Sequence, residues 1–453
     1  MSVPTLHTAL PGAETLSRRL TGTLLLPGEP DWPAASTPWN VSITARPRAV
    51  VLAADAADVQ AAVSHAAAHG LRVAVHGPGH GASAALDGTL LIRTTALREL
   101  QVLPERRVAV VGAGVTWGEL QAALDGTGLT GLVGSSPSVS VVGLLLQGGS
   151  SWLTRSYGAA AGSLRSAEVV WADGSSGRVD AGTDAEALWA LRGGGGRFAV
   201  VTSVEIDLVP TGDLAGGRLM FPVDAATAVL AAFRAATSTV DPRTSLWLSV
   251  LHFPPLPELP EPLRGRSFVT VDAVTTAGLQ ALERVLEPVR ASGPVVHDTV
   301  RARTAAQLTE ICEEPVEPTP AVQRGIPLAG LGDDAATAFL RVATAPGPFV
   351  MLQLRHLAGA PSSDLGIGTR VDAEYLVNAL AIAAGPEAEE AGRQAADGLA
   401  ATLSPWTGGS LPASLVAPWR SLADAYPRDQ IDRLATLTRR LDPAQRFVAA
   451  LQA

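Results

Sequence analysis

A histidine inside a glycine-rich loop is the strongest candidate for chemistry in this sequence. Residues 76–81 read His-Gly-Pro-Gly-His-Gly and directly follow a short apolar run at 71–75. Glycine lets the backbone approach an anion closely and present its amide hydrogens, as binding of a pyrophosphate requires. His80 would then lie beside the ligand; a turn residue with a solvated ring is the alternative reading for any single glycine loop.

Three more glycine-rich segments follow in the same half of the chain, at 134–137, 148–149 and 192–196. Four such loops favour one extended ligand laid across the backbone over four unrelated tight turns. A Rossmann dinucleotide site is disfavoured at 112–118. The glycine spacing there is one residue too long, and no acid ends the next stretch, 127–133.

The elements that must hold these loops alternate short apolar strands with helices. Strands are expected at 49–52, 71–75, 89–92, 107–111, 167–171 and 199–208, and a helix at 58–69 ends at Gly70. After Pro210 the pattern of predicted helices and strands changes. Helices expected at 225–235, 279–287 and 388–403 mix with strands at 244–251, 268–271 and 349–356. This pattern predicts a second, α+β domain.

Composition excludes several classes of protein. The chain has 453 residues, of which 47% are hydrophobic and 17% charged, and its net charge is −9. This length predicts two or three domains, and the negative balance disfavours binding to nucleic acid. All 34 basic residues are arginine. The absence of lysine excludes a pyridoxal Schiff base and a Walker phosphate loop.

The cysteine count and the lengths of the apolar runs argue against disulfides, metal sites and membrane spans. Cys312 is the only cysteine, so no internal disulfide can form, and no Cys/His cluster has the spacing of a metal site. No signal peptide is evident in the first 24 residues. Proline and glycine interrupt every apolar run before it reaches membrane-spanning length. We therefore expect a cytoplasmic protein without a membrane partner.

Six segments together carry a specific resemblance to a known family. They lie at 38–40, 75–80, 111–118, 152–158, 167–174 and 188–198. In order and spacing they resemble the berberine-bridge-enzyme-like branch of the vanillyl-alcohol-oxidase flavoproteins, whose FAD-binding domain is of the PCMH type. Weaker matches at 353–356, 375–378 and 431–447 extend the resemblance over most of the chain.

The resemblance implies an α+β fold in three segments. Residues 1–210 would form a two-part FAD-binding domain, and 211–404 a central substrate domain whose antiparallel sheet is covered by helices. Residues 405–453 would return to the FAD-binding domain. The implied cofactor is FAD, joined covalently at its 8α-methyl carbon to a ring nitrogen of His80. Such a bond raises the flavin's reduction potential and prevents loss of the cofactor.

The resemblance also implies a set of cofactor-binding residues spread over the glycine-rich loops and their neighbours. They are His76, Gly77, Pro78, Gly79, His80, Gly81, Ser136, Val139, Val142, Gly143, Gly148, Gly149, Trp152, Gly196 and Val201.

The sequence departs from the family pattern at several positions. Ser136 stands where doubly linked members have a cysteine, so only the His80 link is expected. Pro78 lacks an N–H that could contact phosphate. Gly162 stands where an aspartate is usual. Other side chains replace expected glycines beside the flavin: Ser140, Val142, Gln147 and Ser151. Residues 411–415 lack the tyrosine and asparagine of the family's Tyr-x-Asn motif, so the usual phenolate base is missing from its place.

We predict an FAD-dependent oxidase that dehydrogenates an alcohol or amine in a small natural-product substrate. Hydride would pass to flavin N5 and then to molecular oxygen, giving hydrogen peroxide; Val139 resembles the position that admits oxygen. His356 and Tyr375 are the first candidates for the base, followed by His252 and Glu374. The enzyme would act as a monomer or a homodimer.

Two alternatives remain open. The eroded glycines and the missing tyrosine favour a redox-neutral isomerase or cyclase on the same fold, which would orient its substrate by shape. His80 and the glycine loop at 192–196 oppose it, because neither has an evident use without a flavin. A non-catalytic binding protein is supported only by the same losses.

Overall fold

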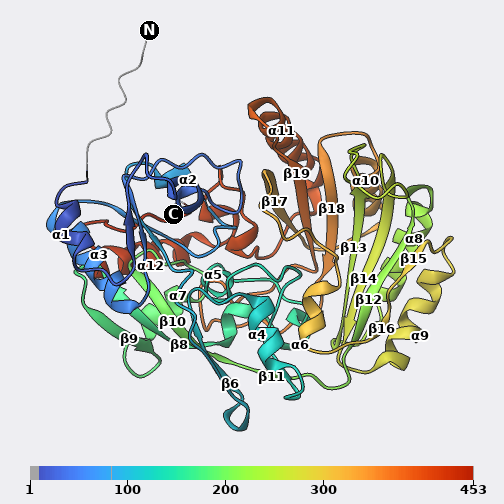
Figure 1. Cartoon of the computed structure of the whole chain (residues 1–453). Helices are drawn as coiled ribbons and strands as arrows, with labels where there is room; N and C mark the ends of the chain where they lie inside the picture. The colour runs from blue at the N-terminus through green and yellow to red at the C-terminus, as the bar shows by residue number, and fades with distance from the viewer. Residues whose placement is uncertain (1–9, 83, 452–453) are drawn as a thin grey trace.

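The computed structural model describes residues 10–82 and 84–451. The chain forms two bodies that lie side by side, the first built from the N-terminal half and the C-terminal tail, the second from the segment between them (Figure 1). The arrangement is α+β with mainly antiparallel sheets, as the sequence predicted.

The first body begins with a small sheet whose strand order is β1-β2-β4-β3. Its strands are β1 (Thr23–Leu25), β2 (Ala49–Leu52), β3 (Val73–His76) and β4 (Leu90–Arg93), with helices α1 (Ala13–Ser17), α2 (Trp32–Ser36) and α3 (Ala56–Ala68). β2 and β3 both run parallel to β4. The Asp55 side chain accepts from the backbone N–H of Asp58 and so begins α3, whose alanine-rich face packs into the core.

A second sheet completes the first body, in the order β5-β6-β10-β8-β9. Its strands are β5 (Leu100–Leu103), β6 (Val108–Gly112), β8 (Leu164–Trp171), β9 (Ser176–Asp180) and β10 (Ala199–Asp207), and β7 (Leu129–Thr130) pairs with β11 (Val209–Pro210). The helices of this part are α4 (Trp117–Leu124), α5 (Val141–Leu146), α6 (Thr154–Tyr157) and α7 (Ala185–Leu191). Thr116 and Glu119 form a capping box that begins α4.

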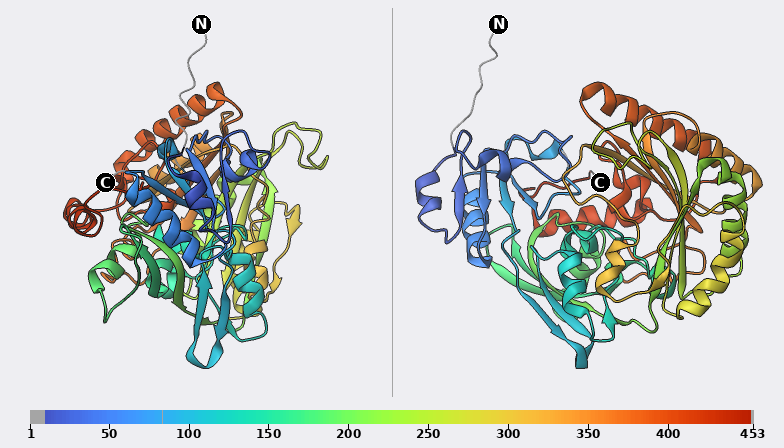
Figure 2. Two further views of the ribbon diagram at one scale, coloured as in Figure 1. Left: turned by 60° about the vertical axis from the view of Figure 1, so that its left-hand side comes forward. Right: turned by 45° about the vertical axis from the view of Figure 1, so that its right-hand side comes forward.

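The second body is one large antiparallel sheet in the order β15-β12-β14-β13-β18-β19-β17, with β16 also pairing with β12. The strands are β12 (Ala215–Pro222), β13 (Thr244–His252), β14 (Ser267–Thr275), β15 (His297–Asp298), β16 (Arg301–Ala302), β17 (Ala321–Leu328), β18 (Phe349–His356) and β19 (Tyr375–Ile382). Four helices cover its outer face (Figure 2): α8 (Ala226–Thr237), α9 (Leu279–Arg290), α10 (Asp333–Ala343) and α11 (Pro386–Leu403).

Strand alternation divides the side chains of this sheet between two environments. Leu246, Leu248 and Val250 of β13 belong to the apolar cluster shared with the covering helices. Trp247, between them, belongs to the core of the first body. Successive strand residues point to opposite faces, so one face of the sheet packs on helices and the other is turned toward the first body.

The C-terminal segment returns to the first body. Helix α12 (Arg428–Leu441) packs near α7, and its Ile431, Leu434 and Leu437 join the first core. Val73 of β3 donates to the carbonyl of Arg446, and Val448 donates back to Val73. The chain end therefore lies against the strand that leads into the loop at 76–81.

Candidate functional site

The loop at 76–81 presents a set of backbone donors without partners. It follows β3 directly, at the carboxyl end of two parallel strand pairs. No acceptor among the described residues takes the amide hydrogens of Gly77, Gly79, His80 or Gly81. Gly79 has φ +95, and a Cβ there would lie 2.9 Å from Pro38 Cβ, so only glycine fits. Convergent unpaired amides are the donors that a pyrophosphate needs.

His80 is held between an indole ring and a pair of serines. Its ring stacks on that of Trp39, with centroids 4.1 Å apart and planes 20° apart. Its Nε2 lies 3.0 Å from Ser138 Oγ, which is itself 3.2 Å from Ser136 Oγ. Burial lowers the pKa of His80 to about 4 despite the contact with Ser138, so the imidazole is neutral at pH 7. The Ser138 contact leaves Nδ1 as the other ring atom open to a ligand.

The segment at 38–40 joins this loop to the second body. Trp39 N–H donates to the carbonyl of Pro78, and its indole N–H donates to the carbonyl of Val316. Asn40 exchanges two hydrogen bonds with the backbone of Ala321, at the start of β17. The loop that carries His80 therefore sits where the two bodies meet.

The side chains that replace glycines are turned inward rather than into the open space. Ser140 Oγ donates to the carbonyl of Ala113 and accepts from Gly143 N–H, capping α5. Val142 is packed in the core, and Ser151 Oγ accepts from Leu153 N–H. Gln147 is half-buried beside Gly195. Ser140, Val142 and Ser151 therefore have partners within the first body, and Gly143 is exposed on the same short helix as Val142.

The other predicted cofactor residues divide into two groups. Gly148 and Gly149 have φ +85 and +70 at the end of α5, and Gly195 N–H donates to the carbonyl of Leu146, so these loops meet. The second group, Val201 and Trp152, is packed in the interior. Val201 is buried in β10, and Trp152 is fully buried, stacked on Trp247 with centroids 3.6 Å apart. Trp152 thus packs the two bodies together.

Three predicted positions remain, His76, Val139 and Gly196. His76 ends β3 with a buried Nδ1 that has no partner among the described residues, and burial lowers its pKa to about 4. The carbonyl of Val139 accepts a hydrogen bond from the N–H of Trp117, which connects the segment carrying Ser136 and Ser138 to the start of α4. Gly196 is half-buried before β10.

The predicted bases His356 and Tyr375 lie on the helix-covered face of the large sheet. They face each other with ring centroids 5.3 Å apart, and the Tyr375 hydroxyl lies 2.7 Å from Thr237 Oγ1 in α8. His252 is also occupied, by Ser267 and the carbonyl of Ala343, and Glu374 is exposed before β19. His356 and Tyr375 are therefore packed beneath the covering helices; the role of a base stays a prediction for these candidates, and the proposed site does not depend on it.

Lowering the pH should destabilise the protein through His356. Burial, with Arg155 nearby, lowers the pKa of His356 to about 3 from 6.5. The folded state binds this proton less readily than the unfolded chain, so the stabilisation is complete above pH 6.5 and is lost as the pH falls toward 3. About 2 kcal/mol should be lost by pH 5.

Urea unfolding at pH 7 and pH 5 measures this loss. The His356→Leu variant should lose less stability between the two pH values, whereas His297→Gln, at an exposed histidine, should behave as wild type. An undiminished loss in His356→Leu would contradict the assignment.

The face turned toward the first body carries a polar array that the sequence analysis missed. Gln353 and Arg355 of β18 alternate with Leu354 and His356, and they point away from the helices. Gln353 Nε2 donates to Ser249 Oγ, its Oε1 accepts from Arg355 Nε, and Asn378 lies opposite it on β19. The two-residue period of Gln-Leu-Arg-His could have revealed this, because the leucine marks the packed face.

The segment at 411–415 reaches the junction between this face and the glycine-rich loops. Ser414 N–H donates to the carbonyl of Gln147, and a Cβ on Gly325 of β17 would lie 2.7 Å from Leu411 Cδ1. The only tyrosine near it, Tyr426, is buried and donates to the carbonyl of Gly193; burial raises its pKa well above the usual value. No phenol from 411–415 takes the place that the family pattern gives to its base.

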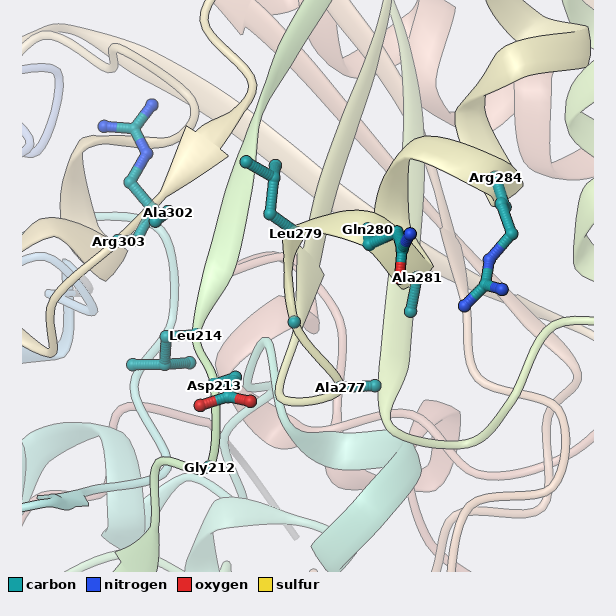
Figure 3. Close-up of a pocket in the computed structure, with 11 residues that line it drawn as sticks. Gly212, Asp213, Leu214, Ala277, Leu279, Gln280, Ala281, Arg284, Ala302 and Arg303 are labelled. Carbon is teal, nitrogen blue, oxygen red and sulfur yellow. The ribbon is translucent and has the colours of Figure 1, made fainter.

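A surface hollow of about 630 Å³ lies apart from these residues, where Asp213 and Leu214 face the start of α9 (Figure 3). Arg303 at its rim already donates to the carbonyls of Gly216 and Thr299. None of the glycine-rich loops at 76–81, 134–137, 148–149 or 192–196 lines the hollow. It is not part of the candidate site.

Residues 47–180 match a family model described as an FAD binding domain. The chain contains an FAD binding domain. This confirms FAD as the predicted cofactor class, and the four unpaired amides at 77–81 fit its pyrophosphate.

Curated relatives include FAD-dependent monooxygenase FUP4 of Fusarium proliferatum, 36% identical over 194 residues, 42% of this chain and 38% of that protein. (R)-6-hydroxynicotine oxidase of Paenarthrobacter nicotinovorans is 27% identical over 305 residues, 65% of this chain and 63% of that protein. The chain thus spans less than two thirds of the length of these relatives. Their names support the predicted class of FAD-linked oxidoreductase.

Solved structures extend the likeness over nearly the whole chain. Physcomitrella patens BBE-like 1 aligns with TM-score 0.83 at 16% identity, covering 97% of this chain and 98% of that one. The 6-hydroxy-D-nicotine oxidase from Arthrobacter nicotinovorans aligns with TM-score 0.79 at 23% identity, covering 94% and 96%. The predicted resemblance to the berberine-bridge-enzyme-like fold is confirmed. Within the described residues, no helix is long and apolar enough to span a membrane.

Proposed function

We propose that this protein is an FAD-dependent oxidoreductase that acts on a small organic substrate between its two bodies. The observation that carries the proposal is the loop at 76–81: unpaired amides stand beside a neutral histidine, and the segment at 38–40 ties this loop to the second body. The polar face with Gln353 and Asn378 would hold the substrate.

The flavin would be held by the backbone of 76–81 and by α5, and when bound it supplies an acceptor for a hydride equivalent from the substrate. This chain's own residues bind, orient and exclude water. Trp152 and Trp247 close the junction on one side, and Trp39 covers His80 on another. We propose molecular oxygen as the electron acceptor, with hydrogen peroxide as the product. Half-buried Val139, the position that would admit oxygen, directly follows Ser138.

Visible absorbance of the purified protein tests the cofactor. The native protein, or the protein incubated with FAD and desalted, should show the two absorption bands of an oxidised flavin. A colourless protein that stays colourless after incubation with FAD would overturn the proposal. Anaerobic bleaching by candidate alcohols and amines, followed by recovery in air, then separates an oxidase from a dehydrogenase.

We further propose that FAD is covalently attached through His80 and that Ser138 positions the ring. Nε2 of His80 lies 3.0 Å from Ser138 Oγ, and in the tautomer that we propose Nε2–H donates to this hydroxyl, so that the lone pair is on Nδ1. Ser138→Ala should slow covalent attachment of added FAD by about tenfold, because the ring loses this orientation and tautomer preference. Ser135→Ala, three residues before Ser138 in the chain, is the matched control.

The measurement for Ser138 is the flavin retained in the acid-precipitated pellet as a function of incubation time. Since noncovalent FAD stays in the supernatant, binding and attachment are read separately. Attachment at the wild-type rate in Ser138→Ala would show that the contact does not orient His80.

A redox-neutral isomerase or cyclase is the second candidate. It is favoured by one observation: residues 411–415 reach the junction without a phenol. Substrate turnover that continues anaerobically for many cycles without flavin bleaching would select this function over the oxidase.

A further inference from the structure

Arg355 is a buried cation without an anion. Its side chain projects from β18 toward the first body, is 7% exposed, and lies with Cζ 4.2 Å from the centroid of the Trp247 ring. Nε donates to Gln353 Oε1 at 2.7 Å. Among the described residues, the two outer nitrogens Nη1 and Nη2 have no hydrogen-bond acceptor, and no carboxylate lies within ion-pair distance.

Other buried arginines of this chain are satisfied. Arg155 donates to four backbone carbonyls, and Arg303 to two. Arg218 pairs with both carboxylate oxygens of Asp272, at 2.6 and 2.9 Å. Buried charges normally have such partners because the desolvation of an unpaired ion is costly. The open outer fork of Arg355 is therefore a feature that a bound ligand would complete.

The residues around Arg355 indicate the chemical character of such a ligand. Gln353 and Ser249 are already bonded to each other, which leaves the planar guanidinium fork as the main donor. Thr270, opposite Ser249 on β14, has a fully buried hydroxyl for which the described residues supply no hydrogen-bond partner. Trp247 and Leu376 supply apolar walls on the same face. The half-buried carboxylate of Glu314 acts on Arg355 electrostatically and disfavours a dianion.

We propose that Arg355 binds a carboxylate of the substrate, so that the substrate is a small organic acid whose apolar part lies along Trp247. A planar fork of two N–H groups matches the two oxygens of one carboxylate. The inference rests on the proposed function, because it places the substrate on the sheet face that would adjoin the flavin. It adds the substrate's charge, which neither the family match nor the relatives specify.

Paired acids and amides test the proposal. Benzoate and phenylacetate are titrated against benzamide and phenylacetamide, with the flavin absorbance of the holoenzyme and the tryptophan fluorescence as parallel readouts. Wild type should bind each acid at least about thirtyfold more tightly than its amide. Arg355→Met should bring this ratio to about one, while Arg341→Met, at an exposed arginine of α10, should keep it.

A second measurement uses the ligand-free protein. Because Arg355 is an unpaired buried charge, Arg355→Met should unfold at an equal or higher temperature than wild type and should lose the stabilisation by benzoate. Equal binding of acids and amides by wild type would overturn the proposal. So would an Arg355→Met protein that keeps the acid preference, or one that loses bound FAD, which would assign Arg355 to the cofactor. A protein without flavin whose tryptophan fluorescence still reports acid preference would contradict the proposed redox function and support the carboxylate site.

Discussion

Replacing His80 by alanine is expected to abolish covalent flavin completely. In wild type, acid precipitation should leave the yellow colour in the pellet; in His80→Ala it should pass entirely to the supernatant. The reason is that Nε2 of His80 contacts Ser138, whereas Nδ1 has no hydrogen-bond partner among the described residues, and Ser136 offers no thiol for a second bond. Intact mass should likewise show the bare chain.

His69→Ala is the matched control, since His69 is an exposed histidine at the end of α3 in the same body. It should keep the yellow pellet. The His80→Ala protein should still take up FAD reversibly, because backbone amides rather than the ring hold the pyrophosphate. A yellow pellet from His80→Ala would assign the link to another residue, and a colourless wild-type pellet from a yellow protein would exclude covalent attachment.

Removing Asp272 should produce the largest loss of stability. Asp272 is fully buried and accepts two hydrogen bonds from Arg218. Burial by itself lowers the pKa of Arg218, but the charge and hydrogen bonds of this carboxylate outweigh it and raise the pKa well above its usual value. Asp272→Ala removes the close partner of this buried guanidinium inside the second body and leaves the half-exposed carboxylate of Glu313, 3.9 Å from Nη1. A loss of about 3–5 kcal/mol in the free energy of unfolding is expected.

Urea unfolding measures this loss, with Asp364→Ala as the control. Asp364 pairs with Arg370 at 2.7 Å on the surface, where an ion pair contributes no more than about 1 kcal/mol. The double variant Arg218→Met/Asp272→Leu should recover most of the stability, because a well-packed apolar pair replaces both charges. If Asp272→Ala and Asp364→Ala lose comparable free energies of unfolding, the buried Arg218–Asp272 pair contributes no more to stability than a surface ion pair.

Much of the fold followed from the sequence because its signals are local. The apolar runs at 199–208 and 349–356 became β10 and β18 almost to the residue, and the helix expected at 279–287 is the first part of α9. Strands β12, β17 and β19 were not assigned from periodicity. Glycine and proline interrupt β12 and β17, and the nearly continuous burial of β12 and β19 hides the two-residue alternation on which such an assignment depends.

The glycine-rich loop at 76–81 could also be predicted from the sequence, because the glycines at 77, 79 and 81 act on the backbone of a few neighbouring residues. By contrast, the catalytic candidates were chosen by residue type, and strand geometry placed His356 and Tyr375 on the packed face. A histidine and an arginine adjacent on one strand cannot share a face. Which of the two faces the first body depends on how the sheet packs against its helices.

The sequence by itself therefore determined that a glycine-rich loop carries His80, and that residue 136 is a serine with no thiol for a covalent link. Only the tertiary structure decided what surrounds them. Ser138 reaches His80 from 58 residues away, Trp39 stacks on it from the first body, and Val316 anchors Trp39 from the second. Glycine loops are specified by local backbone freedom, whereas the partners of His80 and the open fork of Arg355 exist only after distant strands are brought together.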